Sequence, residues 1–129
     1  MNRSIVRKKT AVLIALVATV SAAGLALADG FSTPEGMVCE ETVVARYHAG
    51  PRWSAVDSVI GEHLAFMRRE MQRGAIVAAG PFHESGGLEI HRGSDVAAVA
   101  GVVDRDPLVV RRVVTYSLEP WWMCRPAAR

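Results

Sequence analysis

The sequence has little of what identifies the common functional classes. Its 129 residues contain two cysteines and four histidines, and none of them forms a CxxC, HxH or HExxH pattern. Zinc sites need closely spaced ligands of these types, so we expect no metal site. The glycine-rich nucleotide-binding motifs and the GxSxG motif of serine hydrolases are also absent. The sequence therefore predicts a protein that works without a cofactor.

Clustered positive charge is also missing. Of the 15 basic residues, four (Arg3, Arg7, Lys8 and Lys9) lie in the first nine positions, which leaves 11 arginines against 13 acidic residues in the rest of the chain. The whole-chain charge of +2 thus becomes −2 without residues 1–28. Because nucleic-acid binding needs a dense basic face, we expect no nucleic-acid partner.

Residues 1–28 have the pattern of a secretory signal peptide. A basic start is followed by the apolar run TAVLIALVATVSAAGLALA, which ends in Ala26-Leu27-Ala28 before Asp29. This order of basic, apolar and small-residue regions is typical of a cleaved export signal. The alternative is an uncleaved membrane anchor, since about 18 apolar residues can span a bilayer. Both interpretations place the folded part in the periplasm or outside the cell, and a membrane contact is expected only for the anchor.

The remaining chain alternates between strand and helix patterns. A leader at 29–36 precedes the expected domain at 37–122, and 123–129 is expected to be a tail. Ser54 and Asp57 have the spacing of a capping box, Gly74 is a helix stop, and Ser94 is a second helix cap. The order βαββαβ predicts an α+β, ferredoxin-like fold with a four-stranded antiparallel sheet. The expected strands are 37–47, 75–80, 87–91 and 112–121, and the expected helices are 54–73 and 95–105.

Cys39 and Cys124 lie at the outer ends of the first and last strands. In this topology the last strand runs antiparallel beside the first, so these two ends are neighbours. We therefore predict a Cys39–Cys124 disulfide, which would suit an oxidising compartment. The alternative is two unpaired thiols, one in a strand and one in a loose tail.

His63 is the most informative titratable residue of the first helix. Apolar residues recur there at three- and four-residue spacing, and His63 lies on or at the edge of that stripe. From spacing alone, a core histidine with one hydrogen bond is the commoner role. A general base is the sharper alternative. The stripe consists of Val56, Ile60, Leu64, Met67 and Met71.

The run HLAFMRREMQRGAIVAAGPF, followed by GGLEI, a helix from Ser94, Asp106-Pro107 and VVTYSLEPW, resembles the YCII-related family of small dimeric α/β-barrel proteins. The resemblance covers nearly all of residues 37–122. It implies a ferredoxin-like protomer that pairs with a second copy to form a barrel. It also implies an acid/base dyad at His63 and Asp106, and one family branch eliminates a halide from a chlorinated hydroxyquinone. The export signal and the cysteine pair depart from the family pattern, because most relatives look cytoplasmic.

Each candidate residue also has a plainer interpretation. Asp106 before Pro107 has the pattern of a helix N-cap, a role compatible with dyad membership. Tyr47, Pro81 and Phe82 are candidate substrate-binding residues, but Tyr47 also fits a half-buried strand aromatic, and Gly80-Pro81-Phe82 a tight turn. Taken with these residues, the resemblance implies a homodimeric, cofactor-independent lyase or isomerase acting on a small molecule. The alternative is a non-catalytic ligand-binding or structural homodimer.

Overall fold

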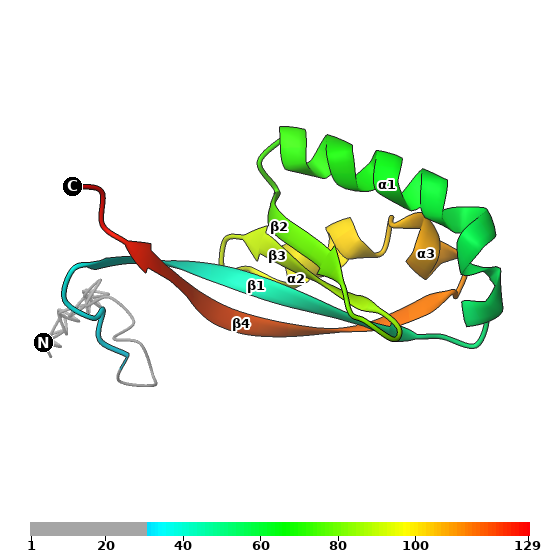
Figure 1. The fold of residues 1–129 in the computed structure, drawn as a ribbon, viewed down its shortest axis with the longest axis horizontal. Helices are drawn as coiled ribbons and strands as arrows, with labels where there is room; N and C mark the ends of the chain where they lie inside the picture. Colours follow the sequence, from blue (N-terminus) through cyan, green and yellow to red (C-terminus); the bar gives the residue numbers. More distant parts are fainter. Residues whose placement is uncertain (1–30) are drawn as a thin grey trace, which may run out of the picture. The chain divides into compact units, whose positions relative to one another are not determined.

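The computed structural model describes residues 31–129, so the predicted export signal lies outside the described residues. Residues Thr33–Arg129 form one compact unit. A single sheet of four strands has its helices on one side (Figure 1). The elements in chain order are β1 (Met37–Ala49), a 3₁₀ turn (Trp53–Ala55), α1 (Val56–Gln72), β2 (Ile76–Pro81), β3 (Gly87–Arg92), α2 (Val96–Val103), α3 (Pro107–Val110) and β4 (Val114–Pro126).

The sheet has the strand order β2-β3-β1-β4, and every neighbouring pair is antiparallel. This is the predicted βαββαβ ferredoxin-like arrangement, with the short α3 added before the last strand. The central strands are β1 and β3, and each has a neighbouring strand on both sides. Side chains from these two strands that point toward the helices are therefore the best shielded from water.

β1 and β4 form a long ribbon, of which only one half belongs to the packed part of the sheet. The two strands pair from Met37 opposite Pro126 to Ala49 opposite Val114, whereas β3 pairs with β1 only from Thr42 to Tyr47. The other half of the ribbon extends beyond β2 and β3 (Figure 1). β4 thus runs past the predicted strand end at 121, because its partner β1 continues alongside it.

The predicted disulfide fastens the extended half of this ribbon. Cys39 and Cys124 are directly opposite in the β1–β4 register, and their sulfur atoms are bonded across 85 residues of sequence. The prediction is confirmed, and it followed from topology alone. A cross-link over so long a loop stabilises the fold by about 4 kcal/mol if loop entropy in the unfolded chain dominates.

The hydrophobic core lies between the sheet and the helices. Val43, Ala45 and Tyr47 alternate along β1 with residues that face the other side of the sheet. Val59 of α1, Val103 of α2 and Leu108 of α3 join the same cluster, together with Val99, Val113 and Val114. A second small cluster holds Phe66, Met67 and Ile76. No helix within residues 31–129 is long and apolar enough to cross a membrane.

The predicted orientation of the first helix is partly wrong. Of the expected apolar stripe only Met67 is buried, whereas Ile60, Leu64 and Met71 are 37%, 51% and 41% exposed. The buried positions are Val59, Phe66, Met67 and Glu70. The helix is therefore rotated so that most of its apolar stripe borders open space. Hydrophobic periodicity identified the helix but not the surface that it faces.

The predicted helix starts are corrected as well. Ser54 lies in the 3₁₀ turn, and α1 begins after Ala55 without a side-chain cap. The α2 helix is capped by Asp95, which accepts a hydrogen bond from the Ala98 amide at 3.0 Å, and not by Ser94. The predicted stop is confirmed: α1 ends at Gln72, and Gly74 has the positive φ of a helix C-terminal glycine.

Candidate active site

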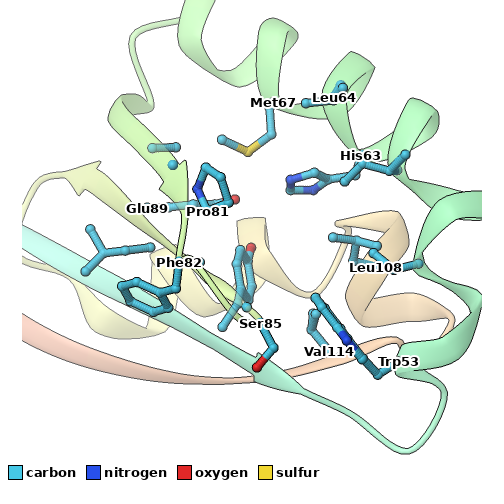
Figure 2. A pocket seen from close by; sticks show the side chains of 18 of the residues that line it. Trp53, His63, Leu64, Met67, Pro81, Phe82, Ser85, Glu89, Leu108 and Val114 are labelled. Atoms are coloured by element: carbon cyan, nitrogen blue, oxygen red, sulfur yellow. The ribbon is translucent and has the colours of Figure 1, made fainter.

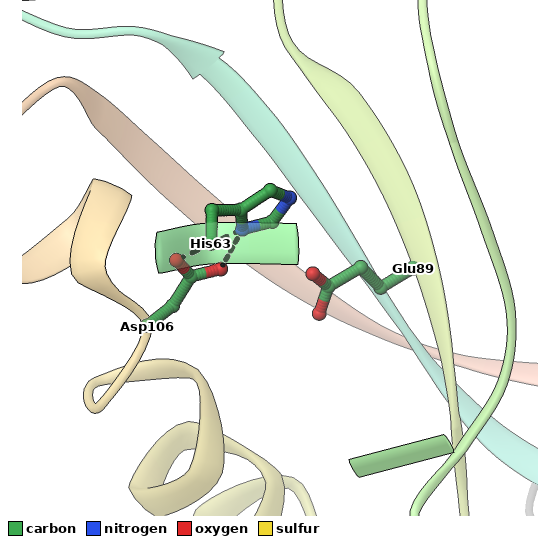
Figure 3. A group of neighbouring side chains, drawn as sticks. All are labelled: His63, Glu89 and Asp106. Carbon is green, nitrogen blue, oxygen red and sulfur yellow. Dashed lines mark hydrogen bonds and ion pairs between the residues drawn. The ribbon is translucent and has the colours of Figure 1, made fainter. Parts of the chain in front are cut away.

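His63 and Asp106 come together from distant parts of the sequence. His63 lies in the middle of α1, and Asp106 immediately precedes α3. The His63 Nδ1 atom is 2.8 Å from Asp106 Oδ2 and 3.0 Å from Oδ1. Dashed lines mark these two contacts in Figure 3. The His63 side chain is 13% exposed and that of Asp106 is fully buried. The pair therefore combines a shielded carboxylate with an imidazole that solvent can still reach.

Asp106 is held in place by three further features of its surroundings. Its Oδ1 atom accepts a hydrogen bond from the Leu108 amide at 2.9 Å, which makes it the N-cap of α3. Pro107 occupies the first helical position, where its missing N–H costs nothing. The Tyr47 hydroxyl donates to Oδ2 at 3.1 Å. One carboxylate thus caps α3 and also contacts the His63 imidazole.

The Asp106 contact determines which nitrogen of His63 is free. An ionised carboxylate can only accept hydrogen bonds, so Nδ1 carries the proton of the neutral ring. The lone pair is then on Nε2. Figure 2 shows the His63 ring between Met67 and Leu108, reaching into a cavity. Neutral His63 consequently offers a proton acceptor on the cavity side.

Tyr47 supports this pair from the central strand β1. It is buried, and its ring meets the His63 ring edge-on, with 6.4 Å between centroids. Burial, and then the charges of Glu89 and Asp106, raise the pKa of Tyr47 above its usual value, so its hydroxyl stays a hydrogen-bond donor. Gly86 has a positive φ and lies against the Tyr47 backbone so closely that a Cβ atom would collide with the Tyr47 carbonyl oxygen. Because only glycine allows this close approach, Gly86 positions the β2–β3 hairpin beside the site.

Glu89 and His91 belong to the same region, and the sequence interpretation missed both. They point to the helix-covered side of β3 and are almost fully buried. Glu89 Oε2 accepts a hydrogen bond from His91 Nε2 at 2.8 Å, whereas Oε1 has no hydrogen-bond partner among the described residues. The available signal was the alternation in GLEIH, which places Glu89 and His91 on one face of the strand.

A cavity of about 790 Å³ opens beside His63. Its walls come from α1, from the β2–β3 hairpin and from the start of β4, and most of its labelled side chains in Figure 2 are apolar. Tyr47, Pro81 and Phe82, the three residues predicted to bind substrate, all line it. The exposed α1 residues Ile60, Leu64 and Met71 line it too, together with buried Met67 and with Trp53, Leu108 and Val114. The apolar stripe of α1 thus forms a cavity wall.

Three ionisable groups in this site lie close enough to one another to be candidate metal ligands. One ligand atom each from His63, Glu89 and Asp106 lies within 4.8 Å of the other two. Figure 3 shows the Glu89 carboxylate directed toward Asp106 and His63. The three residues come from α1, β3 and the turn before α3, so no sequence motif could reveal them. The sequence-based expectation of no metal site considered only local spacing.

No protein-family model matches this sequence, and no curated protein matches it. Among solved structures, the fold is similar to that of 5-chloro-2-hydroxyhydroquinone dehydrochlorinase (TftG) from Burkholderia phenoliruptrix AC1100, determined in complex with 2,5-dihydroxybenzoquinone. The two chains are 16% identical, with a TM-score of 0.53, and the match covers 63% of this chain and 92% of the other. At this identity the likeness shows a shared α+β, ferredoxin-like fold.

Proposed function

We propose that this protein is a cofactor-independent enzyme of the lyase or isomerase type, with a compact cyclic or unsaturated oxo compound as substrate. The observation that carries the proposal is the 2.8 Å contact between His63 Nδ1 and buried Asp106 beside a cavity of about 790 Å³. A histidine held by a carboxylate is suited to proton transfer near neutral pH. The open cavity supplies the access that a purely structural histidine would lack.

In the proposed reaction, His63 Nε2 removes a proton from a carbon next to a carbonyl or enol. The electrons of the broken C–H bond form a carbon–carbon double bond, and the substrate either expels a leaving group or is reprotonated at another carbon. Asp106 keeps Nδ1 protonated and stabilises the imidazolium that forms. A well-placed general base of this kind contributes about 10²–10⁴-fold to the rate. Tyr47, Pro81 and Phe82 would contact the substrate from the cavity wall.

The structural neighbour supports the proposed substrate class. Its name gives a chlorinated hydroxyhydroquinone as the compound acted on, and its complex contains a dihydroxybenzoquinone. Both are compact rings that carry several oxygen atoms. The cavity beside His63 has room for one such ring, and its apolar walls would bury the ring faces.

Proton exchange tests this proposal even while the natural substrate is unidentified. The protein is incubated in deuterated buffer with a panel of small cyclic ketones and with 5-chloro-2-hydroxyhydroquinone, and deuterium uptake and chloride release are followed. We expect at least one compound to react faster than in buffer. His63→Ala should slow that reaction by about 10²–10⁴-fold. His48→Gln, which changes an exposed histidine on β1, is the matched control. A His63→Ala variant that retained the full rate would exclude His63 as the base.

The second candidate function is non-catalytic ligand binding. It is favoured by one specific observation, namely the row of exposed apolar α1 residues along the cavity. A binding protein would use these residues to hold an apolar ligand and would use His63 only for packing. His63→Gln would then change stability but leave ligand affinity unchanged, and no tested compound would exchange its protons.

We also propose that the chain acts as a homodimer through the uncovered face of its sheet. Val44, Leu88 and Ile90 are half-buried on that face, and exposed Trp121 lies beside them around a hollow of about 330 Å³. Apolar residues on a sheet face without helices are best buried against a second sheet. Light scattering should give twice the chain mass, and Ile90→Glu should give the single mass.

The proposed site of action is the periplasm or the cell exterior. The support is the signal-like pattern of residues 1–28 and the Cys39–Cys124 disulfide, a bond that persists in oxidising compartments. In this proposal the leader at 29–36 and the domain at 37–122 form the mature protein with its short C-terminal segment. Mass spectrometry of the exported protein should find Asp29 as the first residue, and an intact Met1 would instead indicate a membrane anchor.

A further inference from the structure

Glu89 has a buried carboxylate oxygen atom that lacks a hydrogen-bond partner among the described residues. Its Oε1 atom is inaccessible to solvent and makes no hydrogen bond to the described residues, although its Oε2 atom accepts one from His91. A buried acceptor left unpaired costs about 1–3 kcal/mol, and more when it is charged. Figure 3 shows the Glu89 carboxylate aimed at Asp106 and His63. The cost falls if a positively charged group joins this cluster.

The described side chains do not supply enough of that charge. Glu89 and Asp106 are two buried carboxylates, and each contacts one imidazole, that of His91 and that of His63 respectively, which carries a positive charge only when it is protonated. The Tyr47 hydroxyl lies near both carboxylates, but its single proton is directed at Asp106 at 3.1 Å and cannot satisfy Glu89 at the same time. Neighbouring buried anions without cations are unfavourable because the low-dielectric interior strengthens their repulsion. A divalent cation would balance both carboxylates.

The side chains of this cluster are also fixed from behind, as metal ligands are. His91 holds Glu89 at 2.8 Å, and the Leu108 amide and the Tyr47 hydroxyl hold Asp106 at 2.9 and 3.1 Å. Metal sites use such outer contacts to orient their ligands. Ligands of one zinc ion lie about 3.4 Å apart when each is about 2.1 Å from the metal. The three groups, now within 4.8 Å of one another, would need to close by up to about 1.4 Å on binding.

We infer that His63, Glu89 and Asp106 form a three-ligand site for a divalent transition-metal ion, open on the cavity side. One imidazole and two carboxylates suit Zn²⁺, Mn²⁺ or Fe²⁺. The imidazole ligand disfavours Ca²⁺ and Mg²⁺, which take oxygen ligands. The fourth position would be available to an oxygen atom of water or of a ligand in the cavity.

This inference goes beyond the proposed function and sets a condition on it. If the ion takes the lone pair of Nε2, that atom is no longer a base. If the ion takes Nδ1, the proton of the neutral ring moves to Nε2, which again has no free lone pair. The ion-bound form and the proton-abstracting form are therefore mutually exclusive. Divalent ions should suppress any reaction that depends on His63.

Calorimetry on the whole folded protein, without a histidine tag and after treatment with a chelator, tests the site directly. Titration with Zn²⁺, and separately with Mn²⁺, should show one ion bound per chain. Glu89→Gln retains the side-chain size and an acceptor for His91, and it should weaken binding by at least about tenfold. Glu84→Gln is the matched control, because it removes an exposed carboxylate at the rim of the same cavity and should leave binding unchanged.

A second variant keeps the test decisive if Glu89→Gln folds poorly. His63→Gln changes a partly exposed side chain, and its Mn²⁺ affinity, measured by electron paramagnetic resonance, should fall by a similar factor. Absence of stoichiometric binding to the wild type would overturn the inference. So would equal binding by wild type, Glu89→Gln and His63→Gln, which would indicate surface sites only. Neither result depends on substrate, so the proton-exchange assay can succeed or fail independently.

Discussion

Two histidine–carboxylate pairs lie on the helix-covered side of the sheet, and they have the same contact distance but differ in access to solvent. His63–Asp106 and His91–Glu89 both have a nitrogen–oxygen distance of 2.8 Å. The His63 side chain is 13% exposed at a cavity, whereas both side chains of the second pair are 2% exposed. The comparison shows that the pair itself does not define a reactive site. Chemistry on a substrate requires the one ring that a substrate can reach.

The two pairs also differ in how many parts of the fold they connect. His63–Asp106 joins α1 to the start of α3, and Asp106 accepts hydrogen bonds from Tyr47 and Leu108 as well. His91–Glu89 lies within β3, two residues apart, and leaves one oxygen unpaired. Asp106 thus connects several elements of the fold, whereas Glu89 forms only a local pair with His91 and keeps one oxygen atom without a partner among the described residues.

The largest expected effect concerns the two carboxylates. Asp106→Ala should lower the free energy of unfolding by about 4 kcal/mol, because it breaks a buried pair and uncaps α3. Glu89→Ala should cost about 2 kcal/mol, since the loss of the His91 contact is offset by removal of the unpaired oxygen. Urea denaturation measures both. Asp106→Asn keeps the cap, so its loss in free energy of unfolding should be smaller than that of either alanine variant. A larger loss for Glu89→Ala than for Asp106→Ala would reverse the contrast between the two carboxylates.

An intermediate effect concerns access to the two rings. In a His48→Gln/His83→Gln background, only His63 and His91 remain of the four histidines. Diethyl pyrocarbonate should then modify His63 quickly. His91 should react at least about tenfold more slowly, because its modification requires local opening of the fold. Mass spectrometry of peptides assigns each site. Similar rates at both rings would show that the His91 pair is open in solution.

Much of the fold, but only part of the site, could be predicted from the sequence. The strand order followed from the βαββαβ pattern, and the disulfide followed from the strand order. Glu89 was missed because alternation in GLEIH equally allows Leu88 and Ile90 to face the core, and hydrophobicity favours them. In the structure, Glu89 and His91 have the buried side. Their burial is stabilised by the hydrogen bond between His91 Nε2 and Glu89 Oε2, which a hydrophobicity pattern does not reveal.

The orientation of α1 could not be predicted for a related reason. A helical pattern shows which side chains share a face, but not whether that face meets the core or a cavity. Ile60 and Leu64 are apolar because they form a wall, and only the placement of the β2–β3 hairpin opposite them makes that wall part of a cavity. The position of the hairpin depends on strand pairing, which no local pattern in α1 records.

The smallest expected effect concerns Tyr47 and Tyr116, the two tyrosines of the chain. Like the two histidine–carboxylate pairs, they differ in how deeply they are buried. A hydrogen bond to Asp104 at 2.7 Å, with a smaller contribution from burial, raises the pKa of Tyr116 to about 12. Burial, and then the charges of Glu89 and Asp106, raise the pKa of Tyr47 further. Tyr47 therefore links both pairs, and its hydroxyl should stay protonated as long as the chain is folded.

Alkaline titration followed by tyrosinate absorbance should accordingly show one group with a midpoint near pH 12 in the folded protein. The second group should ionise only as the protein unfolds. Because the pKa of Tyr47 is higher in the folded than in the unfolded chain, its contribution to stability is complete below about pH 10 and declines as the pH rises above that value. Tyr116→Phe should remove the first step and keep the second, and Tyr47→Phe should do the reverse. A reversible Tyr47 step near pH 10 in the folded protein would mean that its hydroxyl is not enclosed by the two carboxylates.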